Sequence, residues 1–292
     1  FVSGSVNFGG YYPRKYDAFT ISATARQNEE AQALEAIYTE AERARRFGFG
    51  KAELDRAKAR TLSNLENTFR QKDKISNDTY AGWIRQYYLT GEPATSADFD
   101  LEFFKQIMDG ITAEEISAKY RELMTDDNRT IIVQGLEGEN IKHLSEQEAL
   151  GILEKVRNGA LTPYEDKAMS ESLISGELKG SPVIKNVPLP QFGAEEWTLA
   201  NNVRVVYKKA DFEKDNILLA AFSFGGISLL DDNLVLPATL MSSLITMYGA
   251  GEYDNITLQK MLSGKKATIA MSLGEVNESI SGTSTPDGRT SE

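Results

Sequence analysis

The sequence contains no cysteine and only one histidine, His143. The absence of cysteine excludes disulfides, thiolate metal sites and a cysteine nucleophile within these residues. The lone histidine excludes any mechanism that needs two imidazoles from this chain. Because no serine–aspartate pattern surrounds His143, we interpret it as a surface or packing residue.

The chain also has little positive charge and no long apolar run. It has 32 Lys and Arg against 43 Asp and Glu, a formal net charge of -11, which opposes binding to nucleic acid or anionic lipid. The longest apolar run, Ile217 to Phe224, is far shorter than the roughly 20 residues that span a bilayer. The segment Phe1 to Ser5 lacks an export pattern and an initiator Met, and reads as if it lay inside a strand, so we expect a fragment.

Residues 1–137 read as a hairpin, a set of helices and a strand. Val6 to Phe8 and Ala18 to Ala25 are expected to pair around turn residues Gly9, Gly10 and Pro13. Apolar residues at three- and four-residue spacing predict helices over about Ala31–Ala44 (stopped near Gly48), Leu54–Phe69, Tyr80–Tyr88 and Phe99–Ile107, and a capping box of Thr112 and Glu115 starts a fifth. Arg129 to Val133 is predicted to be a buried strand.

Residues 138–193 are interpreted as a connector. One helix is expected to start at Ser145 with Glu148 as its capping partner, and another at Thr162, Pro163 and Glu165. Glycines and prolines then interrupt any periodic pattern, so the remainder is predicted to run extended across a surface.

Residues 194–292 start a new α/β pattern. Trp197–Leu199 and Val203–Tyr207 flank the turn pair Asn201-Asn202, and Asn216–Phe224 is expected to be a strand buried on both faces. The other expected elements are a helix over Pro237–Tyr248, a helix capped by Asp254, strands over Thr268–Leu273 and Val276–Ser281, and a polar end at Thr285–Gly288. This last unit has too few elements to look finished, so we expect an uncovered sheet edge that invites pairing with another copy.

Several short motifs resemble ligand-binding sites but lack required residues. Gly225-Gly226 lacks the spaced glycines that lead into a helix in a dinucleotide turn, so a tight turn is favoured. Gly264-Lys265 lacks the Ser or Thr and the upstream Gly of a phosphate loop. Asp98, Asp100 and Glu102 alternate as calcium ligands do, without the turn glycine that a calcium loop requires.

Two further groups have ordinary structural interpretations. The acid pairs Asp126-Asp127 and Asp231-Asp232 stand at element ends and are read as solvated turns rather than acid–base pairs. The aromatic stripe is read as core because it has helical spacing; its members are Tyr80, Trp83, Tyr87 and Tyr88. The residues alone therefore define no catalytic constellation.

Three sets of segments form moderately specific patterns. They are Trp197–Lys209 with Ile217–Leu230, Tyr248-Gly249-Ala250-Gly251-Glu252-Tyr253 followed by Leu258–Lys265, and the helix junction Phe47–Leu54. Through these patterns the chain resembles the pitrilysin/insulinase-type (M16) zinc metallopeptidases over nearly its whole length. The fold that the resemblance implies is α+β, a LuxS/MPP-like sandwich with helices on one face of a mixed, mostly antiparallel sheet.

In that family the first repeat carries His-x-x-Glu-His on a helix, and its imidazoles bind zinc while its glutamate activates water. The matching register here places Thr239 and Ser243 at the histidine positions and Ser242 at the glutamate position. Hydroxyls are poor zinc ligands and poor bases at neutral pH. We therefore predict no catalytic or metal-binding residue in this chain, with degenerate zinc-motif positions at Thr239, Ser242 and Ser243, and zinc in a longer parent.

The resemblance implies three parts: residues 1–137 as the C-terminal part of a non-catalytic second repeat, 138–193 as the connector between halves, and 194–292 as the beginning of a non-catalytic third repeat. The expected function is the chamber and hinge portion of a zinc-dependent metalloendopeptidase that degrades peptides or small unfolded proteins. Its partners would be that substrate and the rest of the polypeptide, in a bacterial periplasm or cell envelope. A catalytically inactive M16-fold partner or scaffold subunit is the alternative.

Overall fold

The computed structural model describes residues 3–11, 16–166, 173, 178–212 and 214–286 of the chain. They form two compact units, which are described separately. Unit 1 comprises Phe1–Lys58, Trp83–Ala94 and Glu102–Lys167, and unit 2 comprises Ala59–Gly82, Thr95–Leu101 and Ala168–Glu292. The fold class is mixed α+β with antiparallel sheets, as the sequence predicts at that level.

Unit 1 joins a β-hairpin to helices. The predicted hairpin is confirmed as the antiparallel pair β1 (Ser3–Tyr11) and β2 (Tyr16–Thr24), whereas the expected turn residue Pro13 lies outside the described residues. Helix α1 (Glu30–Phe47) packs against β2, α5 (Ala113–Leu123) and α6 (Glu146–Asn158). The buried apolar side chains of α1 and α6 are Ala33, Tyr38, Ala41, Ala149 and Val156.

Three predicted helices are confirmed in the middle of the sequence, and each spans residues of both units. They are α2 (Lys51–Arg70), α3 (Asn77–Thr90) and α4 (Ala97–Ile107). Short 3-10 turns follow at η1 (Lys72–Lys74) and η2 (Met108–Gly110), and two more occur later at η3 (Pro190–Phe192) and η4 (Gly226–Leu229).

The junction between α1 and α2 requires glycine at Gly48. Its backbone has φ +74°, and an added Cβ would lie 2.5 Å from the Ser117 hydroxyl oxygen on α5. That hydroxyl accepts a 2.9 Å hydrogen bond from the Phe49 N–H and donates one to the Ala113 carbonyl. Glycine is therefore needed at position 48 for two reasons: its backbone is left-handed, and α5 approaches it too closely for a side chain.

An aromatic cluster fills the space beside this junction. The Tyr120 ring makes edge contacts with Phe19 at 5.4 Å and Phe49 at 5.3 Å between centroids, and its hydroxyl donates to the Ala41 carbonyl. Burial, with a contribution from the negative charge of Glu42, raises the pKa of Tyr120 to about 12. Tyr120 thus ties β2, α1 and α5 together.

Unit 2 contains two three-stranded antiparallel sheets. The first has the order β3 (Val183–Leu189), β4 (Ala194–Leu199) and β5 (Arg204–Tyr207). The predicted Asn201-Asn202 turn joins β4 to β5, with Asn202 at φ 66°. Trp197 on β4 stacks on Tyr207 on β5, with ring centroids 4.9 Å apart.

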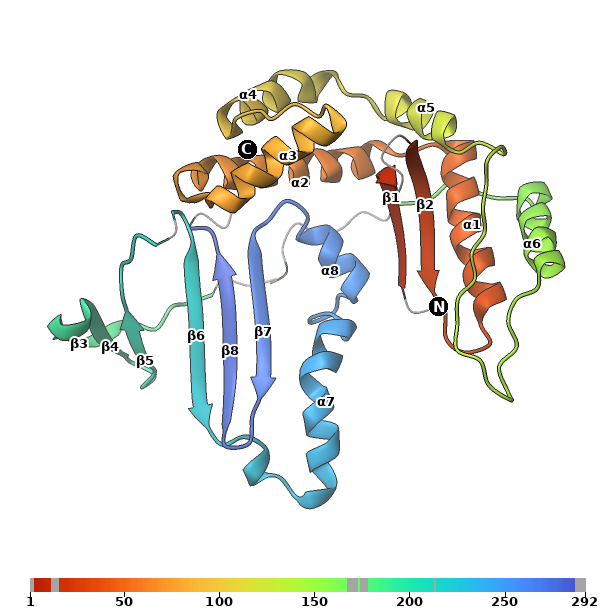
Figure 1. Cartoon of the computed structure of the whole chain (residues 1–292). Helices are drawn as coiled ribbons and strands as arrows, with labels where there is room; N and C mark the ends of the chain where they lie inside the picture. Colours follow the sequence, from red (N-terminus) through yellow and green to blue (C-terminus); the bar gives the residue numbers. More distant parts are fainter. Residues whose placement is uncertain (1–2, 12–15, 167–172, 174–177, 213, 287–292) are drawn as a thin grey trace. The chain divides into compact units, whose positions relative to one another are not determined.

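The second sheet has the order β6 (Ile217–Phe224), β8 (Asn277–Ser284) and β7 (Ala267–Leu273). Figure 1 shows the helix α7 (Asp232–Tyr248) beside β7, which it contacts, and α8 (Asn255–Met261) follows it. The predicted cap of α8 is confirmed, since the Asp254 carboxylate accepts from the Thr257 N–H at 2.7 Å. The expected end Thr285–Gly288 is described only as far as Pro286.

Two predicted elements of residues 129–166 are wrong. Arg129 to Val133 forms no strand, because no described strand pairs with it. The Arg129 guanidinium instead binds the Tyr38 hydroxyl and the Asp126 carboxylate. The helix expected at Thr162 to Glu165 is also absent: Arg43 donates to the Thr162 carbonyl, and the rest of that expected helix reaches residues outside the described ones.

Two predictions of burial are wrong as well. The strand at 216–224 exists as β6, but every one of its residues from Ile217 to Phe224 is exposed, because no described element covers either face there. The aromatic stripe on α3 is not core: Tyr88 is 85% exposed, and Tyr80 and Tyr87 are exposed too. The segment from 178, predicted to run extended, includes the strand β3, which pairs with β4.

Candidate functional site

The helix α7 carries the positions that the family resemblance singles out. Thr239, Ser242 and Ser243 all lie within α7, and Thr239 and Ser243 are four residues apart, so they share one face of the helix. Thr239 is exposed, and its hydroxyl donates to the Leu236 carbonyl at 2.8 Å. The structure therefore places these three hydroxyl residues on one helix, and the zinc-motif register stays a prediction.

This set of side chains does not fit a zinc ion. Among the described residues, no group of three or more His, Cys, Asp or Glu side chains could hold a metal ion. Aliphatic hydroxyls remain protonated at neutral pH and do not supply the imidazole or carboxylate donors that zinc selects. None of the described helices, α7 included, is long and apolar enough to cross a bilayer.

The turn at Gly225-Gly226 is a packing feature, as the sequence predicts. The N–H groups of Gly225, Ile227 and Ser228 donate to the carbonyls of the β7–β8 turn, at 2.8–2.9 Å. An added Cβ on Gly226 would lie 2.5 Å from the Gly274 carbonyl. Because these donors are already bonded to the backbone, they do not form a phosphate cradle.

A second close turn follows α7 in the segment that carries part of the family resemblance. Gly249 has φ 98°, and an added Cβ would lie 2.1 Å from the Tyr253 carbonyl oxygen. Ala250 and Tyr253 exchange backbone hydrogen bonds at 3.1 Å. The glycines of this motif therefore serve backbone geometry rather than ligand binding.

Several of the remaining sequence candidates have structural partners. The His143 imidazole lies 2.8 Å from the Glu30 carboxylate, and Asp126 pairs with Arg129 and Arg157. Asp98 pairs with Lys72, and Asp100 accepts from the Thr95 hydroxyl. These contacts hold local structure, and they do not bring the sequence candidates together into one site.

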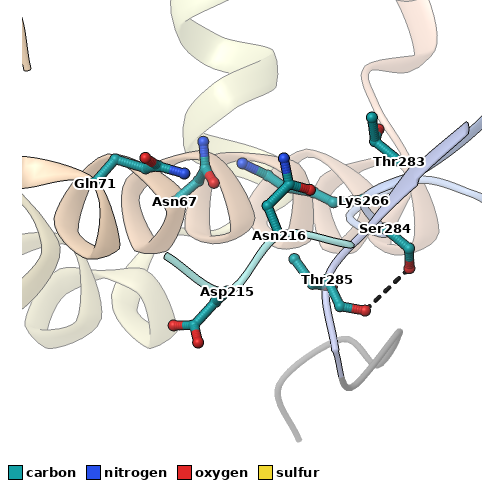
Figure 2. A pocket seen from close by; sticks show the side chains of 8 residues that line it. All are labelled: Asn67, Gln71, Asp215, Asn216, Lys266, Thr283, Ser284 and Thr285. Carbon is teal, nitrogen blue, oxygen red and sulfur yellow. Dashed lines mark hydrogen bonds between the residues drawn. The ribbon is translucent and has the colours of Figure 1, made fainter. Parts of the chain in front are cut away.

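A polar cavity of about 230 Å³ in unit 2 is a feature that the sequence did not reveal. Figure 2 shows its lining residues, which come from the end of α2, the turn before β6, the start of β7 and the end of β8. These segments are far apart in the sequence, so no local sequence motif predicts the cavity. The neighbouring Gly264-Lys265 pair is an incomplete phosphate-loop motif and does not by itself predict a cavity.

Comparison with known proteins shows similarity to a zinc protease. No family model matches the chain. A protein of Arabidopsis thaliana described as "Zinc protease PQQL-like" is 22% identical over 233 residues, which are 78% of this chain and 24% of that protein. The chain therefore spans about a quarter of the length of this curated relative. The resemblance to M16-type zinc proteases is confirmed.

Solved structures with some likeness carry related names. They are the periplasmic protease PqqL from Escherichia coli (TM-score 0.49, 19% identity, 98% of this chain and 31% of that one), the ferredoxin protease FusC in complex with Arabidopsis ferredoxin (0.47, 13%, 97% and 32%) and pitrilysin (0.47, 14%, 97% and 29%).

Proposed function

We propose that this chain forms the non-catalytic chamber wall and hinge of a zinc-dependent M16-type metalloendopeptidase that degrades peptides or small unfolded proteins. The observation that carries the proposal is the match to a zinc protease along 78% of this chain but only 24% of the relative. Zinc and the groups that activate water would then be supplied by other parts of the parent polypeptide.

The chemistry of α7 supports the non-catalytic assignment. A zinc helix needs two imidazoles one turn apart and a carboxylate that serves as base. The corresponding positions, Thr239, Ser243 and Ser242, carry hydroxyls, and the Thr239 hydroxyl is already bonded to the backbone of its own helix. A chamber wall or hinge needs no zinc ligand and no catalytic base, so hydroxyl side chains at these positions are compatible with the proposed role.

The finer architecture belongs to the same proposal. We assign residues 1–137 to the closing part of a second repeat, 138–193 to the connector and 194–292 to the opening of a third, each repeat being a LuxS/MPP-like sandwich. The contact of α7 with β7 supports a helix laid on a sheet in the last part. A periplasmic or cell-envelope location of the parent is a further part of this proposal.

The test measures zinc and hydrolysis in parallel. The purified chain is incubated with zinc, freed of loosely bound metal and analysed for elemental content, and peptide cleavage is followed with and without a chelator. We expect substoichiometric zinc and no cleavage. A variant with Thr239→His, Ser242→Glu and Ser243→His is the positive control, because it restores two imidazoles four residues apart and should retain more zinc.

Two sets of results test the proposal and distinguish it from its alternative. Tight stoichiometric zinc together with chelator-sensitive cleavage by the unaltered chain would overturn the proposal. The alternative is an inactive M16-fold partner or scaffold subunit, and assays of the parent polypeptide distinguish it from the endopeptidase. A parent that hydrolyses peptides only when loaded with zinc supports the endopeptidase. A parent that has no activity but binds an active homologue supports the partner subunit.

A further inference from the structure

The polar cavity of unit 2 has a defined construction. Gly264, with φ +80°, lies so close to α2 that an added Cβ would come within 3.1–3.3 Å of Ala59 atoms, which brings the start of β7 against that helix. Lys266 follows two residues later, and its carbonyl accepts from the Thr285 N–H. The side chains of Asn67, in the last turn of α2, and of Gln71, the residue after α2 ends, also line the cavity.

The lining is rich in groups that can donate hydrogen bonds. It includes the amides of Asn67, Gln71 and Asn216, the hydroxyls of Thr283 and Ser284, and the Lys266 ammonium. Gln71 already donates to the Lys214 carbonyl, Ser284 donates to the Thr285 carbonyl, and Thr283 shares a hydrogen bond with Thr268. In Figure 2 the Lys266, Asn67 and Asn216 side chains point toward one another, whereas the Asp215 carboxylate points away from them. Within the described residues, neither the Lys266 ammonium nor the Asn67 amide makes a side-chain hydrogen bond.

In the part of the chain that the structure describes, no acidic side chain forms an ion pair with Lys266. On α2, Glu66 forms an ion pair with Arg70, so its charge is shared with another cation. Burial first, and the positive charge of Arg70 second, lower the pKa of Lys266, and Glu66 opposes them only in part. The protonated amine is therefore under-stabilised, and a ligand of opposite charge would relieve that cost.

We propose that this cavity binds a small oxyanion, the carboxylate or phosphate group of a ligand, with the Lys266 ammonium supplying the charge and the Asn67 amide donating a second hydrogen bond. A volume of about 230 Å³ exceeds many times the ~10–15 Å³ that one water needs, so an oxyanion group fits. This inference is independent of the proposed protease role, since none of these residues lies on α7.

The ligand chemistry follows from the donors. Ammonium, amide and hydroxyl groups in a partly desolvated recess match the lone pairs of a carboxylate or phosphate, and hydrogen bonds to charged groups are the stronger kind. Anion binding also favours the protonated amine, so affinity falls as the pH rises through the pKa of Lys266 in the free chain. Arg70 and Glu66 act on the Lys266 charge and Asp215 lines the cavity, and the positive charge of Arg70 adds to the attraction for an anion.

Calorimetric titration of the full chain tests the proposal, with inorganic phosphate, acetate, and one tripeptide with a free or an amidated C-terminus as probes. We expect saturable binding of at least one anion and a loss of about tenfold or more in Lys266→Gln, the size of one charge-assisted hydrogen bond. Lys265→Gln is the matched control: it removes the same charge from an exposed neighbour and should change affinity less than twofold.

The probes distinguish the source of the oxyanion. Binding of phosphate alone indicates a phosphate ligand, whereas binding of acetate and of the free but not the amidated tripeptide indicates a carboxylate. No saturable binding of any probe, or equal losses in the Lys265 and Lys266 variants, would overturn the proposal.

A second measurement covers the case in which Lys266→Gln fails to fold. Reductive ¹³C-methylation of the unaltered chain makes each lysine visible by NMR, and Lys266 should titrate at lower pH than an ordinary lysine side chain. The bound anion should move that titration to higher pH. If the titration of the Lys266 resonance did not shift when the anion was added, the proposal would be contradicted.

Discussion

Glu30 connects two segments that are 113 residues apart in the sequence. One carboxylate oxygen lies 2.8 Å from the His143 Nδ1, and the other accepts from the Leu144 N–H at 2.7 Å. The Leu144 hydrogen bond and then the His143 contact lower the pKa of Glu30, while the Glu30 hydrogen bond raises the pKa of His143. The beginning of α1 is thereby held to the segment before α6.

The pH dependence of this contact has a definite sign. His143 has a raised pKa in the folded chain, so its contribution is complete below about pH 6.5 and is lost as the pH rises through the folded value. Glu30 has a lowered pKa, so its contribution is present above about pH 4.3 and is lost as the pH falls through the folded value. We expect His143→Gln to remove the alkaline decline of the unfolding free energy, measured by urea denaturation across pH 5.5–8.5.

The control for that experiment is Glu139→Gln, an exposed neighbour that should leave the alkaline decline unchanged. Because His143 is the only histidine, its ring proton resonances report its titration without assignment. A titration at or below the usual value for histidine would contradict the raised pKa.

Among the described residues, Glu42 is the largest fully buried side chain, at 1% exposure. Burial opposes its ionisation, yet hydrogen bonds from Arg45 and then Arg46 outweigh that effect, and its pKa is lowered. Arg46 in turn donates to the Val156 and Gly159 carbonyls at the end of α6. Glu42 therefore orients an arginine that satisfies the free carbonyls of another helix.

We expect Glu42→Gln to lower the unfolding free energy by about 1–3 kcal/mol, because a buried charge-assisted network loses an acceptor. Glu40→Gln on the same helix is the control: Glu40 is 62% exposed and pairs with Arg43, so its loss should cost less than ~0.5 kcal/mol. Chemical denaturation of both variants checks the difference, and equal effects would refute the role given to Glu42.

Helix α6 begins with a capping box that includes an ionised carboxylate. Ser145 and Glu148 form a reciprocal capping box, as the sequence predicts. Hydrogen bonds from the Ser145 hydroxyl and N–H, followed by the Lys142 contact, lower the pKa of Glu148 to about 2. We expect Ser145→Ala to cost about 1 kcal/mol of unfolding free energy and to raise the pKa of Glu148.

Gln147→Ala provides the matched control, since it is an exposed position one residue inside the same helix turn. Denaturation curves give the free energies, and carboxyl ¹³C titration gives the Glu148 pKa. If Ser145→Ala left that pKa near 2, the hydroxyl would not be its principal cause.

The elements that depend on short-range contacts could be predicted, and those that depend on distant partners could not. The capping pairs Ser145–Glu148 and Thr112–Glu115 bring their partners within three residues, so the sequence alone specifies them. The strand expected at Arg129–Val133 needs a neighbouring strand, which no local pattern guarantees. The cavity around Lys266 escaped prediction for the same reason, because Asn67 lies far away in the sequence.

For the molecule as a whole, β6 is the main exposed feature. It forms one edge of its sheet, carries no charged residue from Ile217 to Phe224, and leaves Leu218 70% and Phe222 72% exposed. Edge strands without charges or prolines readily pair with another chain. We propose that copies of this chain associate through β6.

Light scattering across a range of concentrations checks this proposal. We expect an average mass that rises with concentration, and a shift toward monomer in Phe222→Lys, which places a charge on the edge strand. Leu178→Lys is the control, because it adds the same charge at a residue that is 77% exposed and outside the strands. A constant monomer mass for the unaltered chain would contradict association.

The stacked pair of Trp197 and Tyr207 gives the chain an optical reporter. Its only other tryptophan, Trp83, belongs to unit 1, whereas Trp197 belongs to unit 2. A Trp83→Phe variant would therefore confine indole fluorescence to unit 2, and Trp197→Phe would confine it to unit 1. Melting curves recorded on the two variants would reveal whether both units lose their structure in one cooperative transition or in separate steps.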